Sequence, residues 1–409
     1  MPNANVANNL YSRKIAKFAN KKNVLKMTIN VEKREIPVLL LTGYLGSGKT
    51  TLVNRILSNR KGIKFAVIVN DIGEVNIDAD LIQKGGIVGQ TDDSLVPLQN
   101  GCICCTLKMD LVNQIGDLCR TGKFDYIVIE ASGICEPAPI ARTICSIPTL
   151  LPGSMLNTPR LDSIVTVVDA LRMKDEFGSG EALRRPDIEE DDLESLIIQQ
   201  IEFCNIVLLN KASEVSGEDL GELREIVKAL NPQAVIHECD YGEIDLDVLL
   251  DTKMFDFDKV ATSAAWIAAI EGDDEEELHN EESGEALEYN ISTYVYYRRP
   301  AMDINMLDYV VSKKWPSNII RAKGLCYFAD EPDKCYLFEQ SGSQKSIKEA
   351  GLWFATMPQE QLEEMMRRDK NLRRDWDPVY GDRMEKIVFI GRDLDTRLID
   401  ELMDSCLTE

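Results

Sequence analysis

Five short runs of apolar residues constrain this chain most, because each run ends in a polar or glycine-bearing turn. The runs occupy residues 37–41, 65–69, 126–129, 164–168 and 206–209. Apolar runs of this length are typical of strands buried on both faces of a parallel sheet. Stretches with helical periodicity separate several of them, so the pattern predicts βαβ units. We therefore expect an α/β domain whose functional residues follow the carboxyl ends of the strands.

The pattern changes near residue 289, where an alternating aromatic run begins. Residues 289–297, 319–328, 334–338 and 386–390 read as strands, and residues 302–314 and 395–406 as helices. Neighbouring strands without a helix between them are typical of antiparallel pairing. This part of the chain is predicted to form a smaller, separate α+β domain.

A phosphate-binding motif follows the first apolar run directly. Residues 43–50, Gly-Tyr-Leu-Gly-Ser-Gly-Lys-Thr, fit G-x-x-x-x-G-K-[ST] in full. Backbone N–H groups of such a loop face phosphate oxygens, and the helix that follows directs its positive end at them. Lys49 is expected to reach the β- and γ-phosphates and Thr50 to bind Mg²⁺. The predicted nucleotide-binding residues here are Gly43, Gly46, Ser47, Gly48, Lys49, Thr50 and Thr51.

Two further residues fit the catalytic part of a nucleoside-triphosphatase. Glu130 ends the strand at 126–129 and Gly133 follows three residues later. An acid there can hold Mg²⁺ through water or orient the attacking water, and a glycine amide can sense the γ-phosphate. A solvated turn is the alternative, which the P-loop disfavours. Lys49, Glu130 and Gly133 are the predicted catalytic residues.

The base-binding segment departs from the guanine-reading pattern N-K-x-D. Asn210 and Lys211 fit, but Ser213 stands where that pattern has Asp. A hydroxyl lacks the charge and the second oxygen with which a carboxylate accepts two hydrogen bonds. Glu214 is one candidate to substitute from the next position. GTP is the expected nucleotide, with ATP or mixed use left open.

Three thiols in four residues form a candidate metal site. Cys102, Cys104 and Cys105 follow a glycine turn, and thiolates select soft ions such as Zn²⁺ and Cu(I). A fourth ligand would come from outside or from Asp71 or Glu74, which follow the second apolar run. The alternatives are a buried cysteine cluster and a redox pair. The eight other cysteines are expected to serve packing.

Charge and cysteine usage bound the partners and the compartment. The chain holds 46 Lys and Arg against 69 Asp and Glu, a formal net charge of −23. Such a surface repels nucleic acid and anionic membrane, so neither is an expected partner. No apolar run approaches the length of a membrane span. Eleven cysteines without disulfide-scaffold density predict a reducing, cytoplasmic setting.

Charge runs also place the domain boundaries. Six Lys and Arg precede Glu32, the first acid, and residues 271–288 hold ten acids, no Lys or Arg, and His279. Both segments read as disordered. The predicted organisation is a basic extension at 1–34, a P-loop GTPase domain at 35–255, an acidic linker at 256–288 and a C-terminal domain at 289–409.

Taken in order along the chain, these motifs resemble the CobW-type metallochaperone GTPases. The specific part is the Gly-Cys-Ile-Cys-Cys segment at 101–105 beside a P-loop, and the likeness spans about residues 36–409. The resemblance implies a slow, Mg²⁺-dependent GTPase that delivers a transition metal to a client metalloprotein. Zinc is the expected metal, with another ion such as Co²⁺ open, and the expected state is a monomer or homodimer.

Three residue choices depart from the family's pattern. Ser213 replaces the guanine-reading acid, Asp71 stands where Glu is more usual, and the linker has one histidine where many members have several. The linker therefore argues against a histidine-based zinc store. A GTP-gated regulatory switch with a structural metal, acting through protein contacts, is the alternative function.

Overall fold

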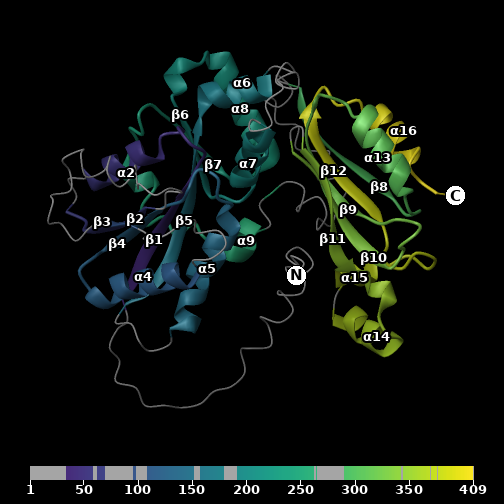
Figure 1. Ribbon diagram of the computed structural model, residues 1–409, viewed down its shortest axis with the longest axis horizontal. Helices are drawn as coiled ribbons and strands as arrows, with labels where there is room; N and C mark the ends of the chain where they lie inside the picture. The colour runs from purple at the N-terminus through teal and green to yellow at the C-terminus, as the bar shows by residue number, and fades with distance from the viewer. Residues whose placement is uncertain are drawn as a thin grey trace. The chain divides into compact units, whose positions relative to one another are not determined.

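The computed structural model describes residues 34–58, 62–69, 95–97, 108–151, 157–178, 191–261, 264, 290–341, 344–368, 370–374 and 376–408. The chain forms two compact units, one of Val31–Ala268 and one that includes Ala269–Glu409 (Figure 1). The division between them falls within the predicted acidic linker. The predicted basic extension lies outside the described residues except for Arg34.

The first unit is built on a seven-stranded sheet in which every neighbouring pair is parallel. The strand order is β3-β2-β4-β1-β5-β6-β7. The strands are β1 (Glu35–Thr42), β2 (Phe65–Val69), β3 (Leu95–Pro97), β4 (Tyr126–Glu130), β5 (Thr158–Asp169), β6 (Ile206–Asn210) and β7 (Val235–Cys239). β2, β4 and β6 are buried along their whole length, as expected for a sheet covered on both faces.

Helices connect these strands in the crossover arrangement that parallel pairing requires. They are α2 (Lys49–Leu57), α4 (Lys108–Thr121), α5 (Pro137–Leu150), α6 (Ala170–Gly178), α7 (Asp191–Glu202), α8 (Gly217–Leu230) and α9 (Phe257–Ala261), with short 3₁₀ turns η2 (Ala212–Glu214) and η3 (Leu246–Val248). α8 begins with a reciprocal capping box between Ser216 and Asp219. The apolar side of α2 packs with β1, β2 and β5 in one core, which fixes the start of α2 above the sheet edge.

The second unit is built on a five-stranded antiparallel sheet of order β11-β10-β9-β12-β8. The strands are β8 (Ile291–Arg298), β9 (Ile319–Cys326), β10 (Lys334–Ser341), β11 (Gln344–Leu352) and β12 (Glu385–Arg392). The helices are α13 (Ile304–Lys313), α14 (Gln359–Arg368), α15 (Lys370–Arg374) and α16 (Thr396–Asp404), with the 3₁₀ turn η4 (Phe354–Thr356). The predicted α/β and α+β fold classes are confirmed.

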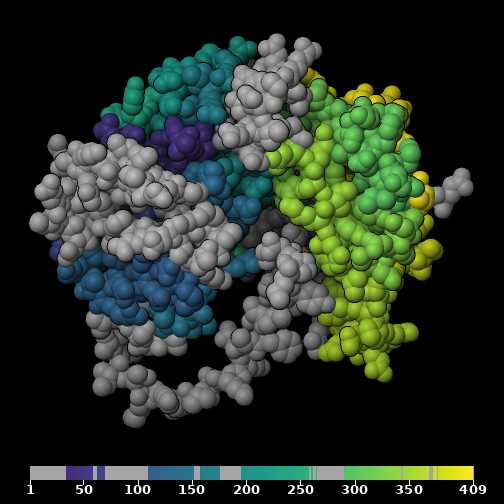
Figure 2. All heavy atoms as spheres, in the orientation of Figure 1, coloured from purple at the N-terminus to yellow at the C-terminus, as the bar shows by residue number. Residues whose placement is uncertain are grey.

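One face of this antiparallel sheet packs against α13 and α16, which lie side by side in Figure 1. Leu307 of α13 and Met403 of α16 share a core with Phe338 and Phe389. α14 and α15 form the lower end of the unit as drawn in Figure 2. Since side chains alternate along a strand, the residues next to Phe338 belong to the opposite face.

Several elements differ from the sequence expectations. α13 begins at Ile304 rather than Met302, because the Asp303 side chain accepts hydrogen bonds from the N–H groups of Asn305 and Met306 and caps the helix. β7, β11, α14 and α15 were not expected, since their sequences lack an apolar run. No helix among the described residues is long and apolar enough to cross a membrane.

Candidate nucleotide-binding site

The P-loop joins β1 to α2 and passes very close to the ends of two neighbouring strands. Gly43 and Gly48 adopt positive φ angles of 138° and 106°. A Cβ on Gly43 would lie 2.3 Å from the carbonyl oxygen of Val167, and one on Gly48 would lie 2.3 Å from Nδ2 of Asn210. Both positions therefore require glycine for conformation and for space. The glycines of the motif fix the loop against β5 and β6.

The interior of this loop carries polar groups suited to phosphate. The ammonium group of Lys49 donates to the carbonyl oxygens of Gly43 at 2.8 Å and Tyr44 at 3.1 Å, and Lys49 is almost fully buried. The hydroxyl of Ser47 is buried and has no hydrogen-bond partner in the described part of the chain. α2 starts at Lys49, so its free N–H groups face the same space. The loop fits an oxyanion ligand.

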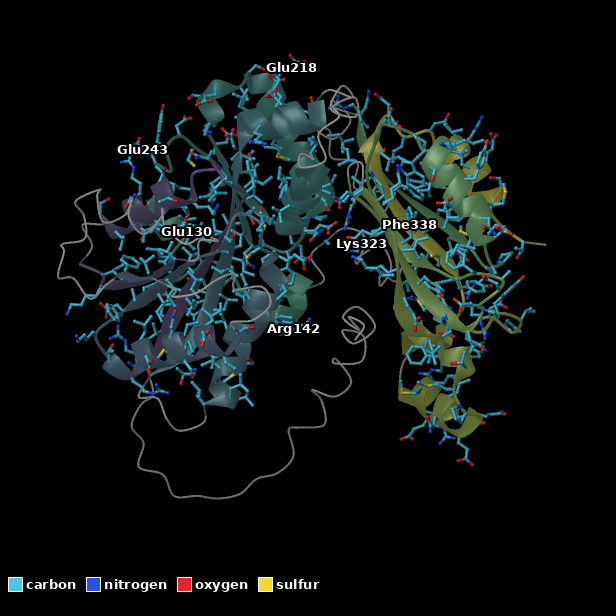
Figure 3. All side chains as sticks on the ribbon, viewed as in Figure 1. Glu130, Arg142, Glu218, Glu243, Lys323 and Phe338 are labelled. Atoms are coloured by element: carbon cyan, nitrogen blue, oxygen red, sulfur yellow. The ribbon has the colours of Figure 1, made fainter. Side chains whose placement is uncertain are left out.

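A hydroxyl and a carboxylate meet beside the P-loop. Thr50 Oγ1 donates to Glu130 Oε1 over 2.9 Å. Glu130 is 1% exposed at the carboxyl end of β4, where it pairs with Leu41 of β1 and Val69 of β2. Figure 3 labels Glu130 within the first unit. Hard oxygen donors next to a phosphate-binding loop are the groups that Mg²⁺ prefers, so these residues fit that ion.

Gly133 lies against the backbone of the P-loop. A Cβ there would approach the backbone nitrogen of Leu45 to 2.7 Å and the Leu45 Cα to 3.2 Å. Leu45 itself is 79% exposed. The turn after β4 is thus in van der Waals contact with the loop that surrounds the phosphate space. This is the placement that a γ-phosphate-sensing glycine needs.

The residues after β6 connect the P-loop to two neighbouring strand ends. Asn210 Nδ2 donates to the carbonyl oxygen of Ser47 at 2.8 Å, and its Oδ1 accepts from the N–H of Gly242 at 3.2 Å. Lys211 forms an ion pair with Asp169 at the end of β5. The predicted base-binding segment is therefore joined by hydrogen bonds to the phosphate loop.

Ser213 contacts an acid that the sequence reasoning did not select. Its N–H and its hydroxyl both donate to Oδ1 of Asp240, at 3.0 and 2.9 Å. Asp240 is the first residue after β7. Its position directly after a strand is the feature of the sequence that could have identified it as a site residue. That signal was missed because Val-Ile-His-Glu-Cys is not a wholly apolar run.

The structure brings together Lys49, Thr50, Glu130 and Gly133, and it joins Asn210 to the P-loop. Thr51 is exposed on α2 next to Thr50. The predicted metal ligands Cys102, Cys104, Cys105, Asp71 and Glu74 lie outside the described residues. Their roles remain predictions.

Most of the thiols that the structure describes are packing residues. Seven of these eight cysteines are buried and none forms a disulfide; Cys145 is exposed. Burial raises the pKa of the Cys119 and Cys239 thiols to about 11, so both stay protonated near neutral pH and are poor metal ligands. Within the described ranges, no group of three or more His, Cys, Asp or Glu residues is placed to hold a metal ion.

Comparison with known proteins agrees with this division of the chain. The family profile "CobW/HypB/UreG, nucleotide-binding domain" matches residues 37–238, and "Cobalamin synthesis protein cobW C-terminal domain" matches residues 291–407. Zinc-regulated GTPase metalloprotein activator 1 of Dictyostelium discoideum is 34% identical over 424 residues, covering 98% of this chain and 87% of that protein. Zinc chaperone CobW of Sinorhizobium sp is 28% identical over 320 residues, covering 75% and 85%.

Among solved structures, zinc-bound YjiA GTPase from E. coli aligns with 92% of this chain and 100% of its own length. The identity is 22% and the TM-score is 0.39, a value too low to carry a structural argument. The family is shown by the two profiles and by the relative from Dictyostelium. The chain belongs to the CobW family, with the nucleotide-binding domain of that family followed by its C-terminal domain.

Proposed function

We propose that this chain is a GTP-dependent metallochaperone, which hydrolyses GTP and delivers zinc to a client metalloprotein. The observation that carries the proposal is the contact between Thr50 and Glu130 beside a complete P-loop. Those two groups are the ones that metal-assisted phosphoryl transfer requires next to the phosphates. The relatives named zinc chaperone and zinc-regulated GTPase metalloprotein activator support the cargo and the nucleotide.

In this proposal the P-loop backbone and Lys49 bind the phosphates of GTP. Lys49 exchanges its two carbonyl acceptors for phosphate oxygens, which carry full charge and bind an ammonium more strongly. Thr50 and Glu130 hold Mg²⁺, directly or through water. When bound, Mg²⁺ would neutralise charge that develops on the transferred phosphoryl group.

Glu130 has a second role in the proposal, which is to orient the attacking water. Its carboxylate is buried and held by Thr50, so it accepts hydrogen bonds from water in a fixed direction.

Gly133 is proposed to respond to loss of the γ-phosphate, which its N–H contacts in the GTP-bound state. Since Gly133 packs on the P-loop, loss of that phosphate changes the position of the turn after β4.

Zinc is the cargo, and Cys102, Cys104 and Cys105 are its proposed ligands. Asp71, Glu74 or a residue of the client would complete a four-coordinate site. In the sequence, Asp71 and Glu74 come after β2 and the three cysteines come after β3, and the carboxyl ends of parallel strands meet at one edge of a sheet. Hydrolysis is therefore proposed to change the ligand geometry and so the affinity for zinc. Whether the chain acts as a monomer or a homodimer stays a prediction.

The test is an equilibrium zinc titration with Mg²⁺ and either GDP or a non-hydrolysable GTP analogue. Wild type is compared with a Cys102/Cys104/Cys105→Ser variant and with Cys119→Ser, a buried thiol on α4, as the matched control. We expect thiol-dependent zinc binding whose affinity differs between the two nucleotides by 5-fold or more, roughly 1 kcal/mol of coupling. Equal zinc affinity with GDP and with the GTP analogue would instead indicate a structural zinc and favour the GTP-gated regulatory switch.

A further inference from the structure

We infer that Asp240, directly after the neighbouring strand β7, supplies the base-reading carboxylate that Ser213 cannot provide. This inference rests on the proposed function, since it assumes that the P-loop binds a guanine nucleotide. It assigns to Asp240 the hydrogen bonds with N1–H and the exocyclic amine of guanine. Ser213 is assigned the task of positioning that carboxylate.

The topology brings the two residues to one edge of the sheet. β6 and β7 are parallel neighbours, and Asn210 at the end of β6 pairs with Cys239 at the end of β7. Asp240 therefore emerges beside the Asn-Lys-Ala-Ser segment, one residue past the strand. An acid can reach the same space from the end of either strand.

The contact leaves one carboxylate oxygen of Asp240 available. Both hydrogen bonds from Ser213 go to Oδ1. Oδ2 has no hydrogen-bond partner among the described residues, and Asp240 is half-buried rather than buried. Because the Ser213 hydroxyl donates a hydrogen bond to Oδ1, it holds the Asp240 carboxylate in place. The carboxylate keeps the charge and the acceptor capacity that a serine cannot provide.

The segment after β7 is itself fixed to the nucleotide site. Asp240 and Glu243 close a tight turn through a 2.9 Å backbone hydrogen bond, with positive φ at Tyr241 and Gly242. The N–H of Gly242 donates to Asn210, which also contacts the P-loop.

A second anchor joins the same turn to α2. Glu243 forms an ion pair with Arg55 of α2, and Figure 3 labels Glu243 beside that helix. That pair is exposed and contributes little by itself, so the hydrogen bonds made by Ser213 and Gly242 are what hold the acid relative to the phosphate loop. A fixed carboxylate is the arrangement that base selection needs.

Glu214, the other acidic candidate, lacks this support. Its side chain is exposed and makes no hydrogen bond within the described residues, and its N–H closes the 3₁₀ turn on Lys211. A carboxylate on an unrestrained side chain loses rotamer entropy when it binds, and exposed charge pairs contribute little. Asp240 is the better placed of the two.

The chemistry distinguishes purines sharply. Guanine presents two donors, N1–H and the exocyclic amine, to one carboxylate. Adenine presents an acceptor at the N1 position, which a carboxylate repels. A site with a charged acceptor discriminates strongly because the wrong base leaves that acceptor unpaired. Xanthine carries a carbonyl in place of the exocyclic amine, so an amide side chain suits it better.

The test measures the affinities of the full chain for GDP, ADP and xanthosine diphosphate, each with Mg²⁺. Asp240→Asn should weaken GDP roughly 10- to 100-fold and strengthen the xanthine nucleotide by a similar factor. Glu214→Gln examines the competing acid, and Glu218→Gln on α8 is the neutral control. The gain for xanthine cannot come from misfolding.

A swap variant, Ser213→Asp with Asp240→Ser, moves the acid to the end of β6. We expect it to restore the preference for GDP over ADP that Asp240→Ser alone abolishes. GDP affinity unchanged in Asp240→Asn would overturn the inference, and loss confined to Glu214→Gln would assign the role to Glu214. Wild type that binds GDP and ADP equally would also overturn it, while wild type that binds neither would overturn the proposed function itself.

Discussion

The P-loop of the parallel unit and the sheet of the antiparallel unit bury charged groups in different settings. In the parallel unit, Lys49 and Glu130 are buried beside the ends of β1 and β4. In the antiparallel unit, Arg321 is fully buried within β9 and pairs with Glu339 of β10. Lys49 and Glu130 lie at the P-loop, whereas Arg321 and Glu339 neutralise each other inside a sheet.

The difference follows from how each sheet is connected. Parallel strands all end at one edge, so side chains that follow several strands meet there and face a ligand. Antiparallel strands alternate in direction, so polar side chains on one face meet across strands instead. Lys323 and Glu339 are such a cross-strand pair, and Lys323 and Phe338 belong to opposite faces of this sheet (Figure 3). A buried charge beside the P-loop is therefore expected to serve chemistry, and one paired within a sheet to serve stability. Asp162, buried within β5 beside Arg160, is of the second kind.

Two buried glutamates, Glu130 and Glu385, and the partly buried Glu339 allow this contrast to be tested, beginning with the largest effect. Glu130→Gln should slow single-turnover GTP hydrolysis by roughly 100- to 1000-fold, because the amide cannot accept a proton or hold Mg²⁺ as a carboxylate does. Glu385→Gln, a buried glutamate of β12, is the matched control and should hydrolyse GTP as wild type does. Hydrolysis by Glu130→Gln at the wild-type rate would remove the contrast.

Glu339→Gln should affect stability and leave hydrolysis unchanged. Glu339 accepts from Arg321 at 2.8 Å and from Lys323 at 3.1 Å, so Glu339→Gln removes a carboxylate charge next to the buried Arg321. We expect a loss of about 2–3 kcal/mol in the free energy of unfolding of the second unit, measured with denaturant. Glu349→Gln on exposed β11 should change it by less than about 0.5 kcal/mol. A neutral Glu339→Gln would contradict the stabilising role.

Gly48→Ala tests whether the close contact between the P-loop and Asn210 matters for nucleotide binding in the first unit. The added Cβ meets Nδ2 of Asn210, so we expect nucleotide affinity to fall about 10-fold and stability to fall by about 1–2 kcal/mol. Gly62 also has a positive φ, but its Cβ would meet nothing within 4 Å. Gly62→Ala should thus cost stability alone. Equal nucleotide affinity in the two variants would show that the contact with Asn210 is unimportant.

The pH dependence of unfolding separates the two glutamates within the second unit. Burial acts to raise the pKa of Glu339, but Lys323 and Arg321 outweigh it and lower that pKa to about 2. A lowered pKa means that its stabilisation is present above the ordinary value of about 4.5 and is lost as the pH falls toward 2. Chemical denaturation of wild type should show a decline of at most about 1.4 kcal/mol per pH unit in that window.

Glu385 should behave in the opposite way. Burial raises its pKa well above the ordinary value, although hydrogen bonds from the N–H groups of Tyr327 and Met302 act to lower it. The stability that its neutral form contributes is therefore fully present below the ordinary pKa of about 4.5 and is lost as the pH rises through the elevated pKa. Glu339→Gln should flatten the decline toward acid pH, and Glu385→Gln should reduce the decline that begins as the pH rises above the ordinary value of about 4.5. The same profile in wild type and both variants would contradict the assignment.

The sequence predicted the parallel unit better than the antiparallel one, for a physical reason. Strands buried on both faces must be apolar throughout, so β1, β2, β4, β5 and β6 were recognisable as runs. β7 at the sheet edge and β11, with Lys345 and Glu349 exposed, carry no such signal. An edge strand need not be apolar throughout, so the polar residues of β7 and β11 leave no apolar run to recognise.

The site was predictable where a motif and a strand end coincide. The P-loop, Glu130 and Asn210 are each adjacent in sequence to an apolar run, so chemistry and position appear together. Asp240 depends on the pairing of β7 with β6, which only the fold specifies. The contact between Gly48 and Asn210 likewise joins residues far apart in sequence, and nothing in their local sequence predicts it.

The most direct test of the account follows zinc and GTP in the same single turnover. Wild type and Glu130→Gln are loaded with zinc and GTP·Mg²⁺, and zinc transfer to a chromophoric chelator is recorded beside phosphate release. We expect zinc to leave wild type at the rate of GTP hydrolysis, and we expect both zinc release and hydrolysis to slow together in Glu130→Gln. Zinc that leaves both proteins at one rate, independent of hydrolysis, would contradict nucleotide-driven delivery.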